Sequence, residues 1–318
     1  MSMLVLDQAQ VEELLTMPEC IALMDETLLA LARGELYQPL RSVVRPPAAD
    51  GFMGLMPAHR GGEAPAFGLK VVCIFPGNPA RGLDAHQGGV ILFDGETGEV
   101  RAIVNASAIT AIRTAAVSAV ATRALAREDA RTLAILGAGV QAKSHLEALR
   151  ALHDWERIVV WSRTRAHAEQ LGVEVADTAE DALRDADVVC TTTTSREPVV
   201  RLEWLKEGAH VNAVGSSIPT TRELDTPTMA AAALFVDRRE STLNEAGDYL
   251  FPAGEAAIGP EHIRAELGDV LAGSAEGRRS PSELTVFKSL GLAVEDLACA
   301  QFLLQRAGEL GRGTEVVF

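Results

Sequence analysis

A chain of 318 residues, of which 47% are hydrophobic and 23% charged, has enough apolar material for two domains or one large one. The net charge of −15 argues against a nucleic-acid partner, because phosphate binding requires concentrated lysine and arginine. We find neither a signal-peptide pattern nor an apolar run of about 20 residues, and therefore expect a cytoplasmic protein without a membrane partner. The cysteines lie far apart among apolar neighbours, as buried thiols in a reducing compartment do: Cys20, Cys73, Cys190 and Cys299.

The N-terminal third is predicted to combine helices with an antiparallel or mixed sheet. Apolar residues recur at helical spacing in residues 8–15 and 18–33, and Gly34 is a plausible stop. Short β-like runs separated by Gly, Pro and Asp follow at residues 41–45, 52–56, 67–74, 89–93 and 100–104. The segment 94–98 is typical of a hairpin turn between the last two runs.

The rest of the chain is predicted to form a doubly wound parallel sheet, because strands alternate with helices. An Ala-rich helix at 105–125, capped by Asn105 or Ser107, and a charged boundary stretch at 127–131 precede it. Strands are expected at 133–136, 157–161, 173–175, 186–191, 210–214, 234–237 and 285–288. Helical runs are expected at 167–171, 178–184 and 291–310, and residues 241–279 contain no clear strand.

The strand at 133–136 ends on a pattern that predicts a dinucleotide-binding turn. The sequence Gly137-Ala138-Gly139-Val140-Gln141-Ala142 fits G-x-G-x-x-G/A and lies between a predicted strand and a predicted helix. The first glycine would permit the tight turn, and the second would let a pyrophosphate approach the N-terminus of the helix. Such turns also occur for structural reasons alone, but this context favours a cofactor.

The end of the next strand predicts which nicotinamide cofactor is preferred. A site for the non-phosphorylated cofactor has Asp or Glu at this point, to bond the ribose 2′-hydroxyl. This chain has Ser162-Arg163-Thr164, whose guanidinium and hydroxyls suit a 2′-phosphate. Alternatively, Arg163 is only a solvated loop residue that binds no phosphate. Given the turn upstream, we favour NADP(H) over NAD(H).

Three cations lie in apolar surroundings, where an unpaired buried charge is costly. Lys70 lies within a β-like run, Arg113 in the Ala-rich helix, and Arg41 at the start of another run. Together they suggest a shared small anion such as a substrate carboxylate. Structural ion pairs, or an edge-strand lysine facing water, are the alternatives.

Two further features are less specific. The threonine run at 191–194 follows a predicted strand, and its hydroxyls could bond ribose or phosphate or simply form a β-prone loop. His86 alone is more often a hydrogen-bonded structural residue than a catalyst. The seven histidines form no metal-binding motif, so we expect no metal.

Several stretches together resemble the ornithine cyclodeaminase/mu-crystallin family over about residues 41–296. They are residues 67–70 (FGLK), 109–116 (ITAIRTAA), 135–142 (ILGAGVQA), 208–215 (GAHVNAVG) and 286–291 (VFKSLG). The resemblance implies an α/β fold with a Rossmann doubly wound parallel sheet at 127–291. This NAD(P)-binding domain would be inserted in a discontinuous α+β substrate-binding and dimerisation domain, residues 1–126 plus 292–318. It also implies a homodimer and a reaction through the imine of an amino acid, with hydride exchanged with the nicotinamide.

The resemblance implies roles for individual residues. Arg41, Lys70 and Arg113 would hold the substrate carboxylate and polarise the imine. His86 and Arg113 would also approach the cofactor. The remaining cofactor contacts would come from the turn and from later strand ends: Gly137, Ala138, Gly139, Val140, Gln141, Ser162, Arg163, Thr164, Thr191, Thr192, Val214 and Leu290.

One departure from the family pattern bears on the reaction. The resemblance implies the pattern Gly-x-Asp-x-Pro after the fifth strand in ornithine cyclodeaminases and related alanine dehydrogenases. This chain has Gly215-Ser-Ser217-Ile-Pro219 at that place. Ser217 occupies the place of the acid, as serine does in mu-crystallin-like ketimine reductases. A serine hydroxyl cannot balance a substrate ammonium or serve as a ready base at neutral pH. The departure favours NADPH-dependent reduction of a ketimine or cyclic imino acid to an amino acid.

Two alternatives stay open. One is an ornithine cyclodeaminase or amino-acid dehydrogenase that uses Glu63, Asp84 or another carboxylate in place of the missing acid. The other is a non-catalytic protein that keeps the NADPH pocket and serves as a sensor or ligand carrier.

Overall fold

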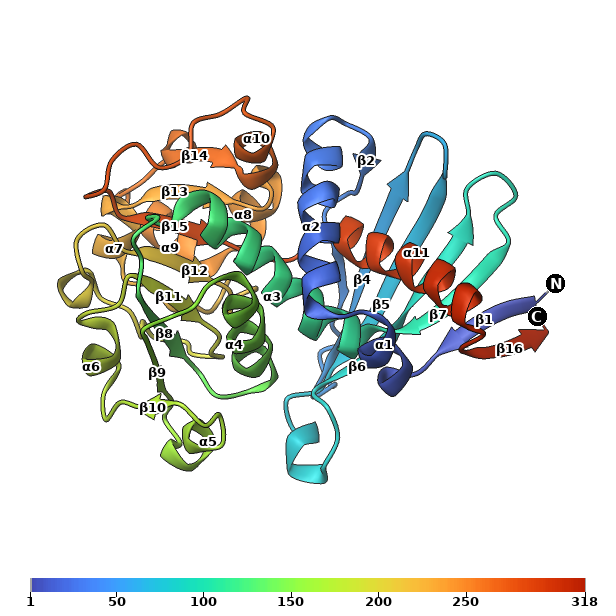
Figure 1. Cartoon of the computed structure of the whole chain (residues 1–318), viewed down its shortest axis with the longest axis horizontal. Coiled ribbons are helices and arrows are strands. Elements are labelled where there is room, and N and C mark those ends of the chain that lie inside the picture. The colour runs from blue at the N-terminus through green and yellow to red at the C-terminus, as the bar shows by residue number, and fades with distance from the viewer. Residues whose placement is uncertain (1, 318) are drawn as a thin grey trace. The chain divides into compact units, whose positions relative to one another are not determined.

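The computed structural model describes residues 2–317, which form two compact units (Figure 1). The first unit comprises the chain up to Thr114 and again from Leu292, and the second comprises Ala115–Gly291. The second unit is therefore an insertion in the first. The division falls inside α3 (Ala106–Leu125), earlier than the boundary at 126/127 that the sequence suggested. The substrate and cofactor functions of the two units stay predictions.

The first unit contains a mixed, mostly antiparallel sheet with strand order β16-β1-β7-β6-β5-β4-β2, in which β3 also pairs with β4. β1 runs parallel to β7, whereas the pairs from β7 to β4 are antiparallel. β1 also pairs with β16, so both ends of the chain lie on neighbouring strands (Figure 1). The strands are β1 (Ser2–Leu6), β2 (Leu36–Tyr37), β3 (Ser42–Val44), β4 (Phe52–Arg60), β5 (Ala66–Ile74), β6 (His86–Asp94), β7 (Val100–Asn105) and β16 (Thr314–Val317).

Helices of the first unit cover one face of this sheet. α11 (Ala293–Leu310) packs on β4 and β5 and against α2 (Met17–Ala32), and α1 (Gln8–Leu14) lies against α11 and β7 (Figure 1). Thr16 and Glu19 form a capping box at the start of α2, which explains why the helix begins there. A short 3₁₀ turn, Asn78–Arg81, lies between β5 and β6.

The strand β5 shows how closely α11 approaches the sheet. Gly68 and Lys70 are buried beneath the helix, whereas Phe67 on the opposite face is 49% exposed. A Cβ added at Gly68 would lie only 3.0 Å from Cδ1 of Leu297, so the glycine permits the contact. Lys70 therefore points to the helical side of the sheet and cannot be an edge lysine facing water.

The second unit contains an all-parallel sheet with strand order β10-β9-β8-β11-β12-β15-β13-β14. β11, β12, β13 and β15 are buried at every residue, as expected when both faces are covered. The strands are β8 (Thr132–Leu136), β9 (Arg157–Trp161), β10 (Glu174–Val175), β11 (Val188–Thr191), β12 (His210–Ala213), β13 (Ala233–Val236), β14 (Ile263–Glu266) and β15 (Thr285–Lys288). The predicted α/β fold with a doubly wound parallel sheet is confirmed.

Parallel strands need crossover connections, and most of these are helical here. The helices are α4 (Val140–Leu152), α5 (Arg165–Glu169), α6 (Ala179–Leu183), α7 (Thr226–Ala231), α8 (Arg239–Glu245), α9 (Gly247–Gly254) and α10 (Leu267–Leu271). Short 3₁₀ turns lie at Leu202–Trp204 and Pro260–His262.

The helix α3 corrects one expectation. Within residues 2–317 it is the one helix long and apolar enough to cross a membrane by length and composition, although the sequence suggested no such run. However, 72% of its apolar window is buried, which is typical of a core helix. Asn105 caps it by accepting a hydrogen bond of 2.9 Å from the N–H of Ala108.

Some short edge strands were missed by the sequence patterns. The prediction of no strand in 241–279 was wrong, because β14 lies there and pairs with β13 at the edge of the sheet. β14 has only four residues and alternates buried with half-buried positions, too short a run to stand out. β16 was missed because each of its residues is exposed, so it carries no apolar pattern.

Candidate functional site

Lys70, predicted to bind substrate, is buried with defined partners in the first unit. It lies in the middle of β5, opposite Met56 of β4 and Val90 of β6. Its side chain is 4% exposed, and Nζ donates to Oγ1 of Thr110 at 2.6 Å and to Oδ1 of Asp296 at 3.1 Å. The lysine therefore joins β5 to α3 and α11.

Arg113 belongs to the same cluster. Its Nε donates to Oδ1 of Asp296 at 3.1 Å, and Nη1 donates to Oε2 of Glu295 at 2.6 Å. The side chains of Arg113 and both acids are at most 4% exposed. We call Lys70, Arg113, Glu295 and Asp296 the buried charge cluster. Its two cations balance its two carboxylates, which is the condition under which buried charges are tolerated.

The surroundings of Lys70 in the buried charge cluster set its pKa. Burial lowers the pKa of Lys70 to about 8, the positive charges of Arg113 and Arg41 push the same way, and Asp296 opposes them. Arg41, half-buried just before β3, is thus close enough to act on Lys70. A lysine with this pKa is mostly protonated at neutral pH yet able to release its proton, which suits a general acid.

His86, the first residue of β6, lies close enough to Lys70 for the lysine's positive charge to act on it. Surrounding protein atoms and the charge of Lys70 lower the pKa of His86, while Asp84 opposes them. The side chain is nevertheless exposed to solvent, and its carbonyl accepts a hydrogen bond of 2.6 Å from Ser107. A neutral imidazole at this position is able to donate or accept a hydrogen bond to a ligand.

The predicted dinucleotide turn of the second unit fits a pyrophosphate. Gly137 follows β8 with φ of +117°, and a Cβ there would lie 2.5 Å from Oγ1 of Thr192, so glycine is required. Gly139 begins α4 with no side-chain cap, and a Cβ there would meet nothing within 4 Å. Val140 is 63% exposed. The N-terminus of α4 is therefore open to an anionic group.

The segment Ser162-Arg163-Thr164 follows β9, the strand beside β8. The two strands end together, because the N–H of Gly137 donates to the carbonyl of Trp161 at 2.8 Å. Arg163 is exposed, and no hydrogen bond or ion pair joins its side chain to another residue of 2–317. Ser162 is half-buried, and its Oγ accepts from the N–H of Thr164 at 3.4 Å.

The other residues predicted to bind the cofactor follow three further strands of the same sheet. Thr191 ends β11 and Thr192 follows it, Val214 and half-buried Ser217 follow β12, and Leu290 follows β15. Because β9, β8, β11, β12 and β15 are parallel neighbours, their carboxyl ends share one edge. Ligands of such sheets bind outside that edge.

Both threonine hydroxyls already donate within the protein. Oγ1 of Thr191 donates to Oε2 of Glu223 at 2.7 Å, and Oγ1 of Thr192 donates to the carbonyl of Leu136 at 3.0 Å. Thr191 is fully buried. These hydroxyls therefore support the loop, and any contact of Thr191 with a cofactor would involve its backbone.

Sequence reasoning missed the buried carboxylates in each of the two units. Glu295 and Asp296 lie in the first turn of α11, directly before the apolar residues 297–300, which was an available signal. In the second unit, Glu223, Asp248 and Lys288 are fully buried. Lys288 ends an apolar strand and is as conspicuous in sequence as Lys70. Its partners are Asp248 in α9 and the carbonyls of Ala213 and Ser216, which share no regular spacing with it.

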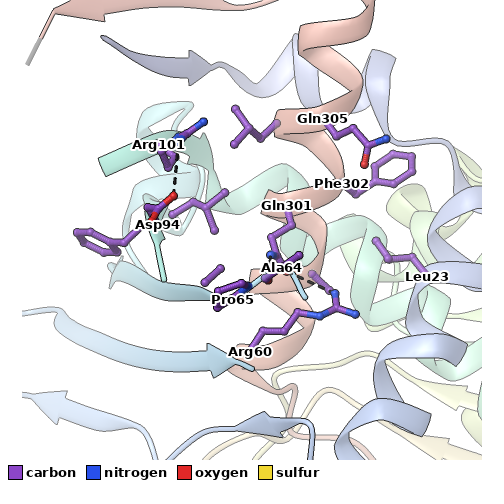
Figure 2. Close-up of a pocket in the computed structure, with 14 residues that line it drawn as sticks. Leu23, Arg60, Ala64, Pro65, Asp94, Arg101, Gln301, Phe302 and Gln305 are labelled. Atoms are coloured by element: carbon purple, nitrogen blue, oxygen red, sulfur yellow. Dashed lines mark hydrogen bonds and ion pairs between the residues drawn. The ribbon is translucent and has the colours of Figure 1, made fainter. Parts of the chain in front are cut away.

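A cavity of about 440 Å³ lies elsewhere in the first unit, between α11 and the ends of β4 to β7 (Figure 2). Its polar side chains contact one another: Nη1 of Arg60 donates to Gln301 at 3.4 Å, and Arg101 pairs with Asp94 at 3.5 Å. It contains none of the predicted site residues. Within the described part of the chain, no group of three His, Cys, Asp or Glu residues is placed to hold a metal.

Comparison with known proteins identifies relatives along almost the whole chain. Residues 1–310 match the model of the ornithine cyclodeaminase/mu-crystallin family. The chain is 41% identical to the ketimine reductase mu-crystallin of Mus musculus over 276 residues, 85% of each chain. It is also similar to the Thermococcus litoralis Δ1-pyrroline-2-carboxylate reductase in complex with NADH and L-proline, with 38% identity, a TM-score of 0.93 and coverage of 99% and 100%. An archaeal alanine dehydrogenase dimer with bound NAD is 34% identical, with a TM-score of 0.94 and full coverage of both chains.

The buried charge cluster generates a prediction about Lys70. Replacing Asp296 by Asn removes the main negative charge beside Nζ, so the pKa of Lys70 should fall below its value of about 8. NMR titration of ¹³C-labelled lysine would measure this, aided by the chain having only four lysines. Glu295→Gln is the matched control, because Glu295 pairs with Arg113 rather than Lys70, and should shift the pKa less. An unchanged Lys70 pKa in Asp296→Asn would show that Asp296 does not set its protonation.

Proposed function

The chain belongs to the ornithine cyclodeaminase/mu-crystallin family, and we propose that it uses NADPH to reduce the C=N bond of a ketimine or cyclic imino acid. The observation that carries this proposal is a buried lysine with a pKa of about 8, in a chain with serine rather than an acid at position 217. Relatives named as ketimine and Δ1-pyrroline-2-carboxylate reductases support it.

In the proposed mechanism, a residue of the first unit supplies the proton that the imine nitrogen receives. Lys70 donates from Nζ to the imine nitrogen, and the positive charge that develops there draws hydride to the adjacent carbon. Asp296 and Thr110 fix the position of Nζ through hydrogen bonds of 3.1 and 2.6 Å. Arg41, whose positive charge acts on Lys70, binds the substrate carboxylate together with Arg113. The bound nicotinamide supplies the hydride.

Cyclodeamination or amino-acid dehydrogenation is the second candidate, supported by the likeness to an alanine dehydrogenase. These reactions need a group that balances or deprotonates an amine. Glu63 and Asp84, the carboxylates considered as substitutes, are both exposed, and neither is a hydrogen-bond partner of Lys70, which donates to Thr110 and Asp296. This arrangement favours the reductase.

We also propose a homodimer formed through the helix-free face of the first unit's sheet. Pro57, Leu69, Ile91 and Ile103 form a half-buried apolar row across β4, β5, β6 and β7. A second copy would cover this row, and the dimeric alanine dehydrogenase relative supports that choice. Replacing Ile91 by Glu should prevent dimer formation in analytical sedimentation, whereas the control Val317→Glu, at an exposed position, should not. An Ile91→Glu variant that still sediments as a dimer would contradict the proposed interface.

A cytoplasmic location is part of the proposal. The four cysteines are free thiols, which suits a reducing compartment. α3 is mostly buried, as a core helix is.

The function is tested by supplying cyclic imines with reduced cofactor. Oxidation of NADPH should accompany reduction of Δ1-pyrroline-2-carboxylate or Δ1-piperideine-2-carboxylate, whereas ornithine should release no ammonia. The rate should be steady below about pH 8 and fall above it, because Lys70 then loses the proton it donates. Ammonia release from ornithine would establish the cyclodeaminase instead. NADPH binding without turnover of any substrate would favour a ligand-binding protein.

Arg163 generates a prediction about the cofactor. The unchanged protein should bind NADPH more tightly than NADH by roughly ten- to a hundredfold, the effect of about 1.5–3 kcal/mol from one charge-assisted contact. Arg163→Ala should abolish the difference. Arg165→Ala is the matched control, because Arg165 is already paired with Glu169 and Asp177. Equal affinities in the unchanged protein, or the same loss in both variants, would exclude Arg163 as the 2′-phosphate ligand.

A further inference from the structure

Glu223 is a fully buried carboxylate that lies between two loops of the second unit. Its Oε1 accepts hydrogen bonds from the N–H and Oγ1 of Thr193 at 2.7 and 2.6 Å. Its Oε2 accepts from Oγ1 of Thr191 at 2.7 Å and from the N–H groups of Gly215 and Ser216 at 2.7 and 3.2 Å. One oxygen thus holds the loop after β11, and the other holds both that loop and the loop after β12.

A second buried pair fixes Glu223 itself. Oδ1 of Asp248 accepts from the N–H groups of Glu223 and Leu224 at 2.7 and 3.0 Å. Oδ2 of Asp248 is paired with Nζ of Lys288 at 2.9 Å, and this lysine also donates to the carbonyl of Ser216 at 2.6 Å. The loop after β12 is therefore held from both sides, by Glu223 at its N–H groups and by Lys288 at a carbonyl.

The two loops are in direct contact, so a shift in one must move the other. A Cβ added at Gly215 would lie 2.1 Å from the carbonyl oxygen of Thr193. The loop after β11 in turn touches the dinucleotide turn, where a Cβ at Gly137 would lie 2.5 Å from Oγ1 of Thr192. The contacts run across β8, β11 and β12, which are neighbours in the sheet.

We propose that Glu223 is a positioning residue for the dinucleotide site, holding the loops after β11 and β12 in the arrangement that receives the cofactor. This inference rests on the proposed function, because it takes the carboxyl edge of the sheet as the cofactor site. Glu223 acts through Thr193 and Gly215 and touches no cofactor atom itself.

Only a carboxylate suits this position. Every group that faces Glu223 from the two loops is a donor, and three of them are backbone N–H groups that cannot reverse their polarity. An amide would place its own donor against at least one of these N–H groups. The loops would then separate or rotate, since a buried donor left unsatisfied is costly.

The test compares Glu223→Gln with Asp187→Asn. Asp187 is a matched control at the opposite, amino edge of the sheet: it is 4% exposed and accepts from the N–H groups of Arg131 and Thr132 at 2.8 and 3.0 Å. Both variants should lower the unfolding temperature. Only Glu223→Gln should raise the Kd for NADPH, by about tenfold or more in a fluorescence titration, while Asp187→Asn stays within about twofold.

A folded Glu223→Gln variant with the Kd of the unchanged protein would overturn the proposal. An equal rise in Kd for Asp187→Asn would also overturn it, since the effect would then be general destabilisation. Should Glu223→Gln fail to fold, Thr193→Val decides, because it removes one hydrogen bond to Glu223 and keeps the loop's N–H. It should raise the Kd about threefold without a comparable loss of stability. NADPH binding by the unchanged protein tests the proposed function separately.

Discussion

The need to neutralise a charge taken out of water organises the first unit. Lys70 and Asp296 are 226 residues apart in the chain, and Arg113 and Asp296 are 183 apart, yet all three meet in the core. Removing one partner of such a buried set typically costs about 3–5 kcal/mol, because the remaining charge stays buried without compensation. The buried charge cluster therefore requires that the chain return through α11 after the inserted unit. It also leaves Lys70 with a pKa of about 8, so one arrangement serves folding and the proton transfer that we propose for Lys70.

The second unit presents many backbone N–H and C=O groups at one edge of its parallel sheet. Parallel strands bring their carboxyl ends together, and five neighbouring strands carry the residues predicted to bind the cofactor. The loops at this edge are irregular, so their buried polar groups need partners outside the sheet. Glu223, Asp248 and Lys288 supply those partners, which explains why these three charged side chains are fully buried. Asp187 has the equivalent position at the amino edge, where no cofactor residue is predicted.

Sequence patterns predicted the parts of this protein that depend on local periodicity. Strand–helix alternation indicated the parallel sheet. Gly137 and Gly139 indicated the turn, and at Gly137 only glycine fits. Lys70 and Arg113 stood out as cations in apolar runs. Their carboxylate partners did not, because an ion pair between β5 and α11 leaves no regular spacing in the chain. For the same reason Glu223 was not predicted, since its role depends on two loops meeting it in space. Edge strands such as β14 and β16 were missed because burial, the source of the apolar pattern, is incomplete there.

The central claim is that Lys70 supplies the proton in imine reduction, and the kcat of Lys70→Met tests it most directly. Methionine preserves the volume of the side chain, and the cofactor residues proposed in the second unit are unaltered. The account predicts that kcat falls roughly 10²–10⁴-fold, the usual effect of losing an acid–base group, while the Kd for NADPH changes less than about twofold. A folded Lys70→Met variant with near-normal kcat would contradict the account and leave Ser217, His86 or water as the donor.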